Sequence, residues 1–274
     1  MTVIPVRDLR DPALALYAHL TDAALLGEHG VFVAEGRLVV ERVLNDSRFV
    51  VRSLLVNAAA LEALRPVLQA LPDTVLVYLA ATSQFEALTG FNLHRGCLAL
   101  VERPADAGWR DAVQGCGRVV VLEGVTNADN VGSVFRNAAA FGAGAVLLDP
   151  ACCDPFYRKA VRTSMGTVLR MPVARLRPWP AALLDLRDAG FQIAALTPGA
   201  PSVALADFAS ASASLRVALL VGTEGPGLSA AALALADVRV RIPMASGVDS
   251  LNLSVAAAVV LARLADEPTR VEHI

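Results

Sequence analysis

The sequence has few of the residues that form disulfide bonds in secreted proteins or that bind metals. Its 274 residues include four cysteines, at Cys97, Cys116, Cys152 and Cys153. None of them forms a C-x-x-C pair, and no histidine cluster accompanies them. A disulfide framework and a zinc site are therefore not expected, and four reduced thiols are the simplest interpretation.

The chain also lacks a long apolar run. The longest one, around residues 255 to 262, is far shorter than the roughly 20 residues that a membrane-spanning helix needs. Acids interrupt the first segment, MTVIPVRDLRDPAL, which has no apolar core and does not resemble a secretory signal. We therefore expect a cytoplasmic protein with no membrane partner.

An overall excess of basic residues is absent as well. The formal net charge is −2, with 18% charged and 55% hydrophobic residues. This composition is typical of a globular α/β protein and predicts no general attraction to nucleic acid. The distribution is uneven, because the window between Asp154 and Asp185 holds no acid and six basic residues: Arg158, Lys159, Arg162, Arg170, Arg175 and Arg177. Such a window suits a polyanion, although a solvated charged face gives the same pattern.

The first hundred residues predict a small α/β unit. Residues 11–30 have the pattern of one helix ending near Gly30, and helical patterns also follow within 37–46, 59–71 and 83–90. Between them lie strand-like runs that start with VFV at 31 and continue with FVVRSLLVN, TVLVYLA and GCLALVERP. Pro, Gly and polar residues make 103–118 the expected linker. We expect domains at 1–107 and 108–274.

The second region predicts a parallel sheet covered by helices on both faces. Its strand-like runs are rich in Val, Leu and Ile on both sides and alternate with helical patterns. These runs are RVVVLEG (118–124), AVLLD (145–149), VLRMPVA (168–174), FQIAALT (191–197), LRVALLVG (215–222) and VRVRIPM (238–244). The intervening helices are expected from Asn130, within 157–164 and 179–190, after the TEGPGLS segment, and from Ser250.

A single cation marks the first of three unusual stretches, NADNVGSVFRNAAAFGAGAVLLD (127–149). A helical wheel places Arg136 on the polar half, where no acid stands one turn away to pair with it. Its neighbours at that spacing are all small: Gly132, Ser133, Ala139 and Ala140. A guanidinium without a protein partner suits a phosphate or carboxylate ligand. A solvated arginine on an exposed helix face is the alternative.

The second stretch, LLVGTEGPGLS (219–229), follows a strand and contains three glycines before Ser229, a plausible helix N-cap. Ligands of open α/β sheets bind at such strand ends, so a cofactor loop and an ordinary turn both fit. The spacing G-x-x-G-x-G differs from the dinucleotide motif G-x-G-x-x-G, and Glu224 would repel a pyrophosphate. A nucleotide-dependent oxidoreductase is therefore disfavoured.

The third stretch, IPMASGVDSLNLSVAAAVVLARLA (242–265), ends in a helix that is apolar all round and hence expected to be buried. Its first turn nevertheless carries Ser250, Asn252 and Ser254. Helix capping accounts for one of these polar residues, and the others need further partners. A ligand or a subunit interface would supply them.

Together and in this order, the three stretches are similar to the motifs of the SpoU/TrmH family of RNA ribose 2′-O-methyltransferases. The motifs stand here as Asn130-Val-Gly132-Ser-Val-Phe-Arg136, as Gly222-Thr-Glu224-Gly-Pro-Gly227-Leu228, and as Ile242-Pro243-Met244 with Ser250-Leu-Asn252-Leu-Ser254-Val-Ala256. The match covers about 118–265 and departs from the usual pattern at Asn137, where Thr or Ser is common. VFVAEGRLVVERVL also resembles the start of an L30e-like substrate-binding domain.

The resemblance implies an α/β fold whose C-terminal parallel-sheet domain contains a deep trefoil knot, with a smaller L30e-like domain before it. It also implies a homodimer and S-adenosylmethionine held in the knotted loops, with no metal. It assigns the cofactor contacts to Thr197, Leu220, Gly222, Ile242, Met244 and Leu251. It assigns the reaction and the substrate to Arg136, Asn130, Glu224, Ser250 and Asn252.

The expected substrate is a ribose in structured RNA, ribosomal RNA rather than transfer RNA. Because a guanidinium stays protonated near neutral pH, Arg136 is expected to clamp a phosphate and orient the 2′-hydroxyl rather than take its proton. From the basic window, the expected RNA contacts are Arg158, Lys159 and Arg162. The alternative is a non-catalytic RNA-binding protein of the same fold.

Overall fold

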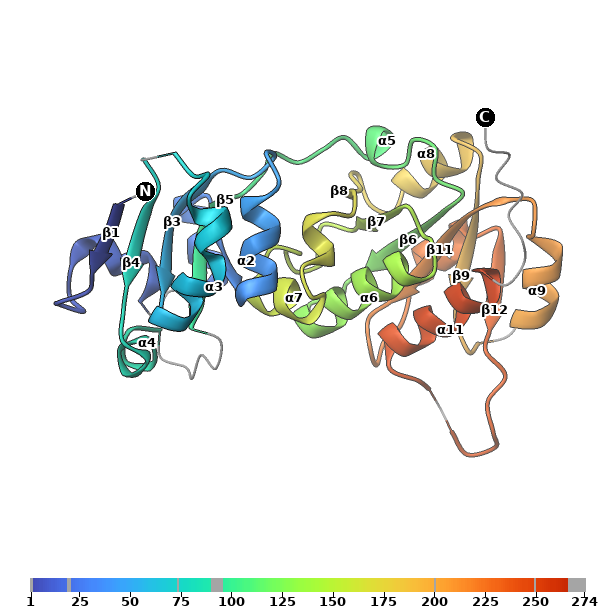
Figure 1. The fold of residues 1–274 in the computed structure, drawn as a ribbon. Helices are drawn as coiled ribbons and strands as arrows, with labels where there is room; N and C mark the ends of the chain where they lie inside the picture. The colour runs from blue at the N-terminus through green and yellow to red at the C-terminus, as the bar shows by residue number, and fades with distance from the viewer. Residues whose placement is uncertain are drawn as a thin grey trace. The chain divides into compact units, whose positions relative to one another are not determined.

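The computed structural model describes residues 2–18, 21–72, 74–89, 96–199, 201–248 and 250–265 (Figure 1). The chain divides into two compact units, and each is built from two separate stretches of sequence. Unit 1 comprises Met1–Ala105 and Pro155–Leu169, and unit 2 comprises Asp106–Asp154 and Arg170–Ile274.

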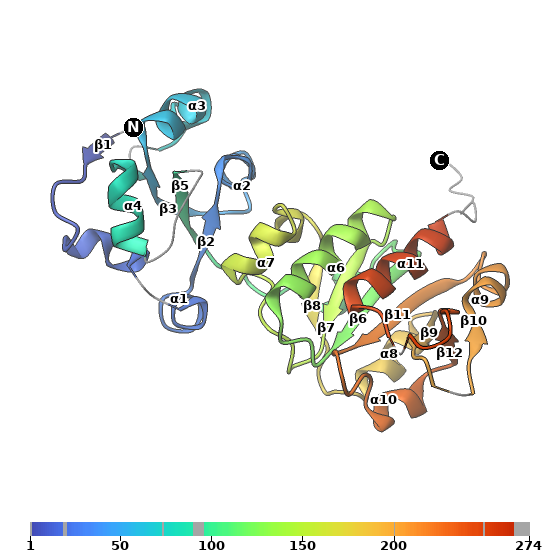
Figure 2. The ribbon, with the colours of Figure 1, turned by 90° about the horizontal axis from the view of Figure 1, so that it is seen from below.

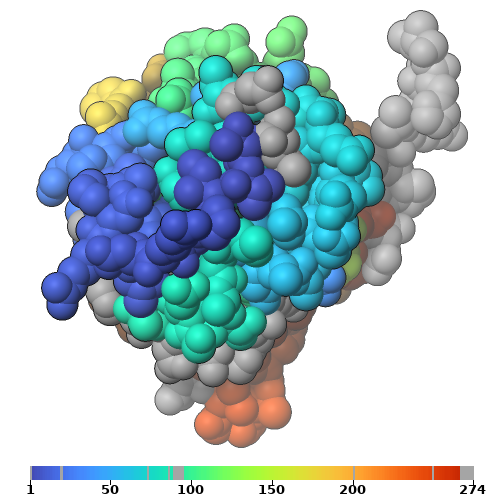
Figure 3. Space-filling model, turned by 60° about the vertical axis from the view of Figure 1, so that its left-hand side comes forward, coloured from blue at the N-terminus to red at the C-terminus, as the bar shows by residue number. Residues whose placement is uncertain are grey.

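Unit 1 contains a mixed sheet. Within the described residues it has five strands in the order β1-β4-β3-β5-β2. The pairs β1–β4 and β4–β3 are parallel, and β5 runs antiparallel to both β3 and β2. The strands are β1 (Thr2–Pro5), β2 (Val31–Glu35), β3 (Val51–Val56), β4 (Leu76–Leu79) and β5 (Cys97–Glu102). Described residues of this unit, coloured blue to teal, can be followed in the space-filling view of Figure 3.

The helices of unit 1 come from both of its stretches. They are η1 (Pro12–Tyr17), α1 (Asp22–His29), α2 (Arg37–Leu44), α3 (Ala58–Leu68), α4 (Thr82–Thr89), α7 (Arg158–Thr163) and η2 (Thr167–Leu169). The prediction of one helix over 11–30 is wrong. A 3₁₀ helix ends at Tyr17, and α1 begins after Thr21, whose side chain accepts a hydrogen bond from the Ala24 amide at 3.2 Å.

Unit 2 is built on the predicted parallel sheet, which the structure confirms. Its described residues form seven strands in the order β10-β12-β9-β11-β6-β7-β8, and every neighbouring pair is parallel. The strands are β6 (Arg118–Glu123), β7 (Ala145–Leu148), β8 (Val173–Arg175), β9 (Phe191–Leu196), β10 (Val203–Ala204), β11 (Arg216–Gly222) and β12 (Val238–Arg241). The central strands β6, β7 and β11 are buried almost throughout, as a sheet covered on both faces requires.

Helices cover both faces of this sheet. They are α5 (Trp109–Ala112), α6 (Ala128–Ala140), α8 (Ala182–Asp188), α9 (Leu205–Ala211), α10 (Ala230–Leu235) and α11 (Leu253–Ala265). Helices α5, α8 and α10 share one hydrophobic core with the strands. On the opposite side α6 and α11 lie against each other (Figure 2). No helix among the described residues is long and apolar enough to cross a bilayer.

Three further predictions about elements need correction. The run 168–174 is not one strand, because η2 ends at Leu169 and β8 begins at Val173. The segment 103–118 is more than a linker, because it contains α5, and Trp109 of this helix and Val113 at its end are buried in the core of unit 2. The last helix does not start at Ser250: α11 begins at Leu253. The Asn252 side chain caps this helix by accepting a hydrogen bond from the Ser254 amide at 3.0 Å.

Candidate active site

A cavity of about 220 Å³ lies in unit 2, at the carboxyl ends of the adjacent strands β9, β11 and β12. This is where open parallel sheets bind their ligands. Its walls come from the turns after these strands and from the start of α11. In Figure 1 residues 242–248, which follow β12, extend away from the sheet. The predicted site residues that line the cavity are Thr197, Gly222, Glu224, Ile242, Met244, Ser250 and Leu251.

The turn after β11 leaves room only for glycine at its start, because backbone atoms from the end of the turn lie against this residue. A Cβ placed on Gly222 would lie 2.4 Å from the Gly227 carbonyl carbon and 2.5 Å from the Leu228 nitrogen. The loop therefore folds back onto the strand end, and the Gly227 amide donates to the Thr223 carbonyl at 3.1 Å. This fold-back brings Glu224 to the cavity wall.

A buried carboxylate that sequence reasoning missed fixes the far end of the same turn. Glu123, at the end of β6, is 7% exposed. Its Oε2 accepts from the Ser229 amide at 2.8 Å, and its Oε1 accepts from Ser229 Oγ at 2.7 Å and from Trp179 Nε1 at 2.8 Å. The sequence indicates a special role for Glu123 in one way only: it is a lone acid at the end of an apolar strand, in the run VVVLEG.

Three predicted residues from three separate motifs form one hydrogen-bonded group. Asn252 Nδ2 lies 2.6 Å from Glu224 Oε1 and 3.0 Å from Asn130 Oδ1. Asn130 Nδ2 in turn donates to the same Glu224 oxygen at 3.2 Å. The carboxylate is thereby held between two amide donors, and the starts of α6 and α11 are tied to the turn after β11.

The polar residues that begin the apolar helix α11 find most of their partners within the chain. Ser254 Oγ donates to Asn252 Oδ1 at 2.7 Å, and the Ser254 carbonyl accepts from Asn137 Nδ2 on α6 at 2.9 Å. Ser250 instead stands at the cavity. Asn137, which departs from the family pattern, therefore has a structural role in joining the two helices.

Arg136 is exposed on α6 and has no hydrogen bond or ion pair with any residue that the structure describes. The buried face of the same helix carries Val131, Val134 and Phe135, as the helical wheel predicts. The guanidinium does not line the cavity. It stays available to an external anion on the helix that supplies Asn130 to the polar group.

The other predicted residues lie outside this arrangement. Leu220 belongs to β11, where its side chain is fully buried in the hydrophobic core and does not line the cavity. Arg158, Lys159 and Arg162 belong to α7, in unit 1. Nitrogens of Arg158 and Arg162 lie 3.7 and 3.8 Å from the carboxylate of Glu35. In the described part of the chain, no group of three or more His, Cys, Asp or Glu side chains could hold a metal ion.

The fold and the site define an α/β domain of the class that binds a small cofactor at the carboxyl ends of parallel strands. Within this class, the chain belongs to the SpoU rRNA Methylase family, whose model matches residues 117–262. The predicted membership of the SpoU/TrmH family of RNA methyltransferases is confirmed.

Relatives extend this likeness beyond the matched region. An uncharacterized tRNA/rRNA methyltransferase of Mycobacterium bovis is 44% identical over 227 residues, which are 83% of this chain and 78% of the relative. The AdoMet-bound rRNA methyltransferase of Sinorhizobium meliloti has a TM-score of 0.80 at 27% identity and covers 96% of this chain and 97% of its own. An RNA 2′-O ribose methyltransferase structure has a TM-score of 0.75 at 26% identity, with coverages of 97% and 99%.

Proposed function

We propose that the protein transfers a methyl group from S-adenosylmethionine to a ribose 2′-hydroxyl in structured RNA, with ribosomal RNA as the preferred class. The observation that carries the proposal is Arg136, a cation without a partner among the described residues, on the helix that also supplies Asn130 to the group around Glu224. The similar structure described as an RNA 2′-O ribose methyltransferase supports the choice of the 2′-hydroxyl.

The cavity fits S-adenosylmethionine in its chemistry. Ile242, Met244 and Leu251 supply apolar walls for an adenosine, and the turn from Gly222 to Gly227 lines the same cavity with little side-chain bulk. Glu224 is an acidic group suited to a cationic ligand. When bound, S-adenosylmethionine supplies a methyl group already activated by its sulfonium. Thr197 completes the proposed set of cofactor contacts, whereas Leu220 supports them from the core.

Arg136 acts on the RNA in this proposal. Its protonated guanidinium cannot take a proton, but its planar donors can hold a phosphate next to the target ribose. That contact orients the 2′-hydroxyl and stabilises the negative charge that develops on its oxygen as its proton passes to water. The oxygen would form its bond to the methyl carbon as the bond from that carbon to sulfur breaks, which leaves S-adenosylhomocysteine. The hydrogen bonds from Asn130 and Asn252 keep Glu224 in place at the cavity wall, and Ser250 stands beside it to position substrate or cofactor.

Unit 1 is the proposed RNA-binding part. It combines most of the L30e-like domain proposed for residues 1–107 with residues 155–169, which come from within the catalytic domain proposed for 108–274. Arg158, Lys159 and Arg162 on α7 remain the proposed phosphate contacts. We assign the trefoil knot of the family to the C-terminal turns that form the cavity. A homodimer is supported by exposed apolar side chains on α11 and the segment before it: Val248, Leu251, Val255 and Val259.

Methyl transfer to RNA from cells that lack this gene tests the proposal. Tritiated S-adenosylmethionine is the donor, the RNA is separated by size, and each fraction is digested with alkali. A 2′-O-methylated linkage resists alkali because the attacking hydroxyl is blocked. Label in alkali-resistant dinucleotides from ribosomal RNA is the expected result. Label in mononucleotides would show base methylation and contradict the proposal, and cofactor binding without any transfer would favour a non-catalytic RNA-binding protein.

A further inference from the structure

Residues 155–169 leave unit 2 between β7 and β8 and become part of unit 1. The chain therefore passes between the units at three points, after residues 105, 154 and 169. Two of these passages bracket a short segment that follows the first motif in sequence. The segment is attached to unit 1 by apolar packing and by hydrogen bonds.

Apolar packing makes the segment an integral part of unit 1. The ring of Phe156 lies 5.1 Å from that of Phe32 on β2, measured between centroids. Side chains of Val161, Val168 and Leu169 are almost fully buried. The segment therefore packs into unit 1 through several buried apolar side chains rather than through a single contact.

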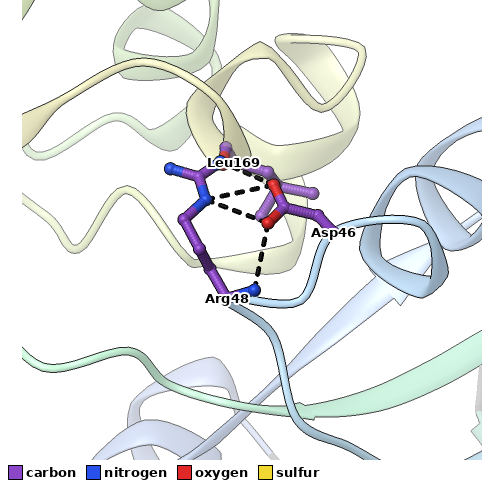
Figure 4. A network of polar contacts seen from close by, with 3 residues as sticks. All are labelled: Asp46, Arg48 and Leu169. Atoms are coloured by element: carbon purple, nitrogen blue, oxygen red, sulfur yellow. Dashed lines mark hydrogen bonds and ion pairs between the residues drawn. The ribbon is translucent and has the colours of Figure 1, made fainter.

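Two arginines of unit 1 hold the end of the segment by its backbone carbonyls. Arg42 on α2 donates to the carbonyl of Met165. Arg48 donates through Nη2 to the carbonyl of Leu169 at 3.1 Å, while Asp46 accepts from its Nε and Nη2 and orients the guanidinium (Figure 4). At the other end, Asp22 accepts from the Arg158 amide at 3.1 Å.

Within unit 2, the residues just before this segment, Cys152 and Cys153, form its root. They are hydrogen-bonded to the turn that precedes the first motif. The Val125 amide donates to Cys152 Sγ at 3.2 Å, and the Cys153 amide donates to the Val125 carbonyl at 3.0 Å. Arg175 Nη1 donates to the Cys152 carbonyl at 3.2 Å. Val125 lies two residues before Asn127, the N-cap of α6. The root of the segment is thus hydrogen-bonded to the turn from which the helix carrying Arg136 begins.

We propose that residues 149–169 couple RNA held by unit 1 to the start of α6, with Arg42 and Arg48 as positioning residues. The inference rests on the proposed function and extends it. Because the segment is fixed to unit 1 and rooted beside the first motif, it restricts the positions that unit 1 can sample while RNA is bound. A tether of this kind raises the effective concentration of the target ribose at Arg136.

The test compares full-length wild type with the double variant Arg42→Ala/Arg48→Ala. The matched control is Arg52→Ala, which breaks a half-exposed ion pair with Glu102 at 3.0 Å on the same unit and leaves residues 155–169 untouched. Hydrogen exchange of the amides in 155–169 reports attachment. KM for RNA from gene-deleted cells, kcat and the Kd of S-adenosylmethionine report function.

The double variant is expected to show faster exchange in 155–169 and a KM for RNA about tenfold higher, with the cofactor Kd unchanged. Arg52→Ala is expected to match wild type in all four measurements. Faster exchange with a wild-type KM would overturn the coupling role alone, and unchanged exchange would show that the arginines do not hold the segment. No transfer by wild type to any RNA would overturn the proposed function itself, and the coupling role with it.

Discussion

Gly222 and Glu123 shape the cavity from the two ends of one turn. The first lets the chain fold back within 2.6 Å of where a Cβ would stand, and the second holds Ser229 where α10 begins. Neither residue reacts with anything in the proposed mechanism. Both residues fix the backbone conformation of this turn. A substitution at either position should therefore lower the affinity for S-adenosylmethionine.

Replacing Gly222 by alanine should displace this turn. The added methyl group meets backbone atoms of Gly227 and Leu228, which cannot rotate away as a side chain would. We expect a loss of about 1–3 kcal/mol in the free energy of unfolding, measured by urea denaturation, and weaker binding of S-adenosylmethionine by calorimetry. Gly117→Ala is the control, because nothing lies within 4 Å of its Cβ position. Wild-type binding by Gly222→Ala would contradict this description of the turn.

The roles of single residues were predictable from the sequence where the neighbouring residues on the same element indicate them. Arg136 stands alone among small residues, and its lack of a partner within the described chain follows from that neighbourhood. Glu123 and Asn137 were not assigned roles, because their partners Ser229 and Ser254 lie 106 and 117 positions further along the chain. Contacts over such separations depend on the tertiary fold.

At the scale of elements, the start of α11 links stability to the site. Asn252 uses its oxygen to cap the helix and its nitrogen to hold Glu224. The strands of unit 2 were predictable because burial on both faces leaves continuous apolar runs. The short strand β10 and helix α9 were not, because the Ala- and Ser-rich sequence around them has no clear period.

Two substitutions at Asn252 should separate its roles. Asn252→Ala removes both and should lower the free energy of unfolding by about 1–2 kcal/mol. Asn252→Asp keeps an oxygen for the cap but places a carboxylate where the amide now lies 2.6 Å from Glu224 Oε1. Repulsion should therefore weaken cofactor binding in this variant while the capping contribution persists.

Urea denaturation and calorimetric titration with S-adenosylmethionine distinguish these results. Asn57→Ala is the control for a lost cap, because Asn57 caps α3 in unit 1 by accepting from the Ala60 amide at 2.8 Å. It should lose stability without losing cofactor affinity. Equal cofactor affinity in wild type and in both Asn252 variants would show that the hold on Glu224 is dispensable.

For the whole molecule, the proposed dimer depends on an apolar surface of α11. Val255 and Val259 stand one helical turn apart and are 48% and 38% exposed. The double variant Val255→Asp/Val259→Asp should elute as a monomer in size-exclusion chromatography with light scattering, and it should lose methyl transfer. Leu184→Asp is the control, since Leu184 is 41% exposed on α8. A monomeric wild type would contradict the dimer.

The way in which separate stretches of sequence make up the two units shows the limit of prediction at the scale of the whole molecule. Sequence patterns separate an N-terminal α/β region from a parallel-sheet region, because helical and strand periods are local properties. They do not show that residues 155–169 pack against β2 and α2. Basic residues in that segment predict a polyanion contact, whereas the structure places Arg158 and Arg162 near Glu35. Only packing between distant segments reveals that arrangement.

The central claim is that Arg136 acts on RNA and not on the cofactor. The most direct measurement compares wild type, Arg136→Ala and Arg136→Lys in two assays, calorimetric binding of S-adenosylmethionine and methyl transfer into alkali-resistant dinucleotides. Cofactor affinity should be equal in all three proteins. Transfer should fall about 100-fold or more in Arg136→Ala, and Arg136→Lys should recover little because lysine lacks the planar donor fork. Wild-type transfer by Arg136→Ala, or a matching loss of cofactor binding, would contradict the account.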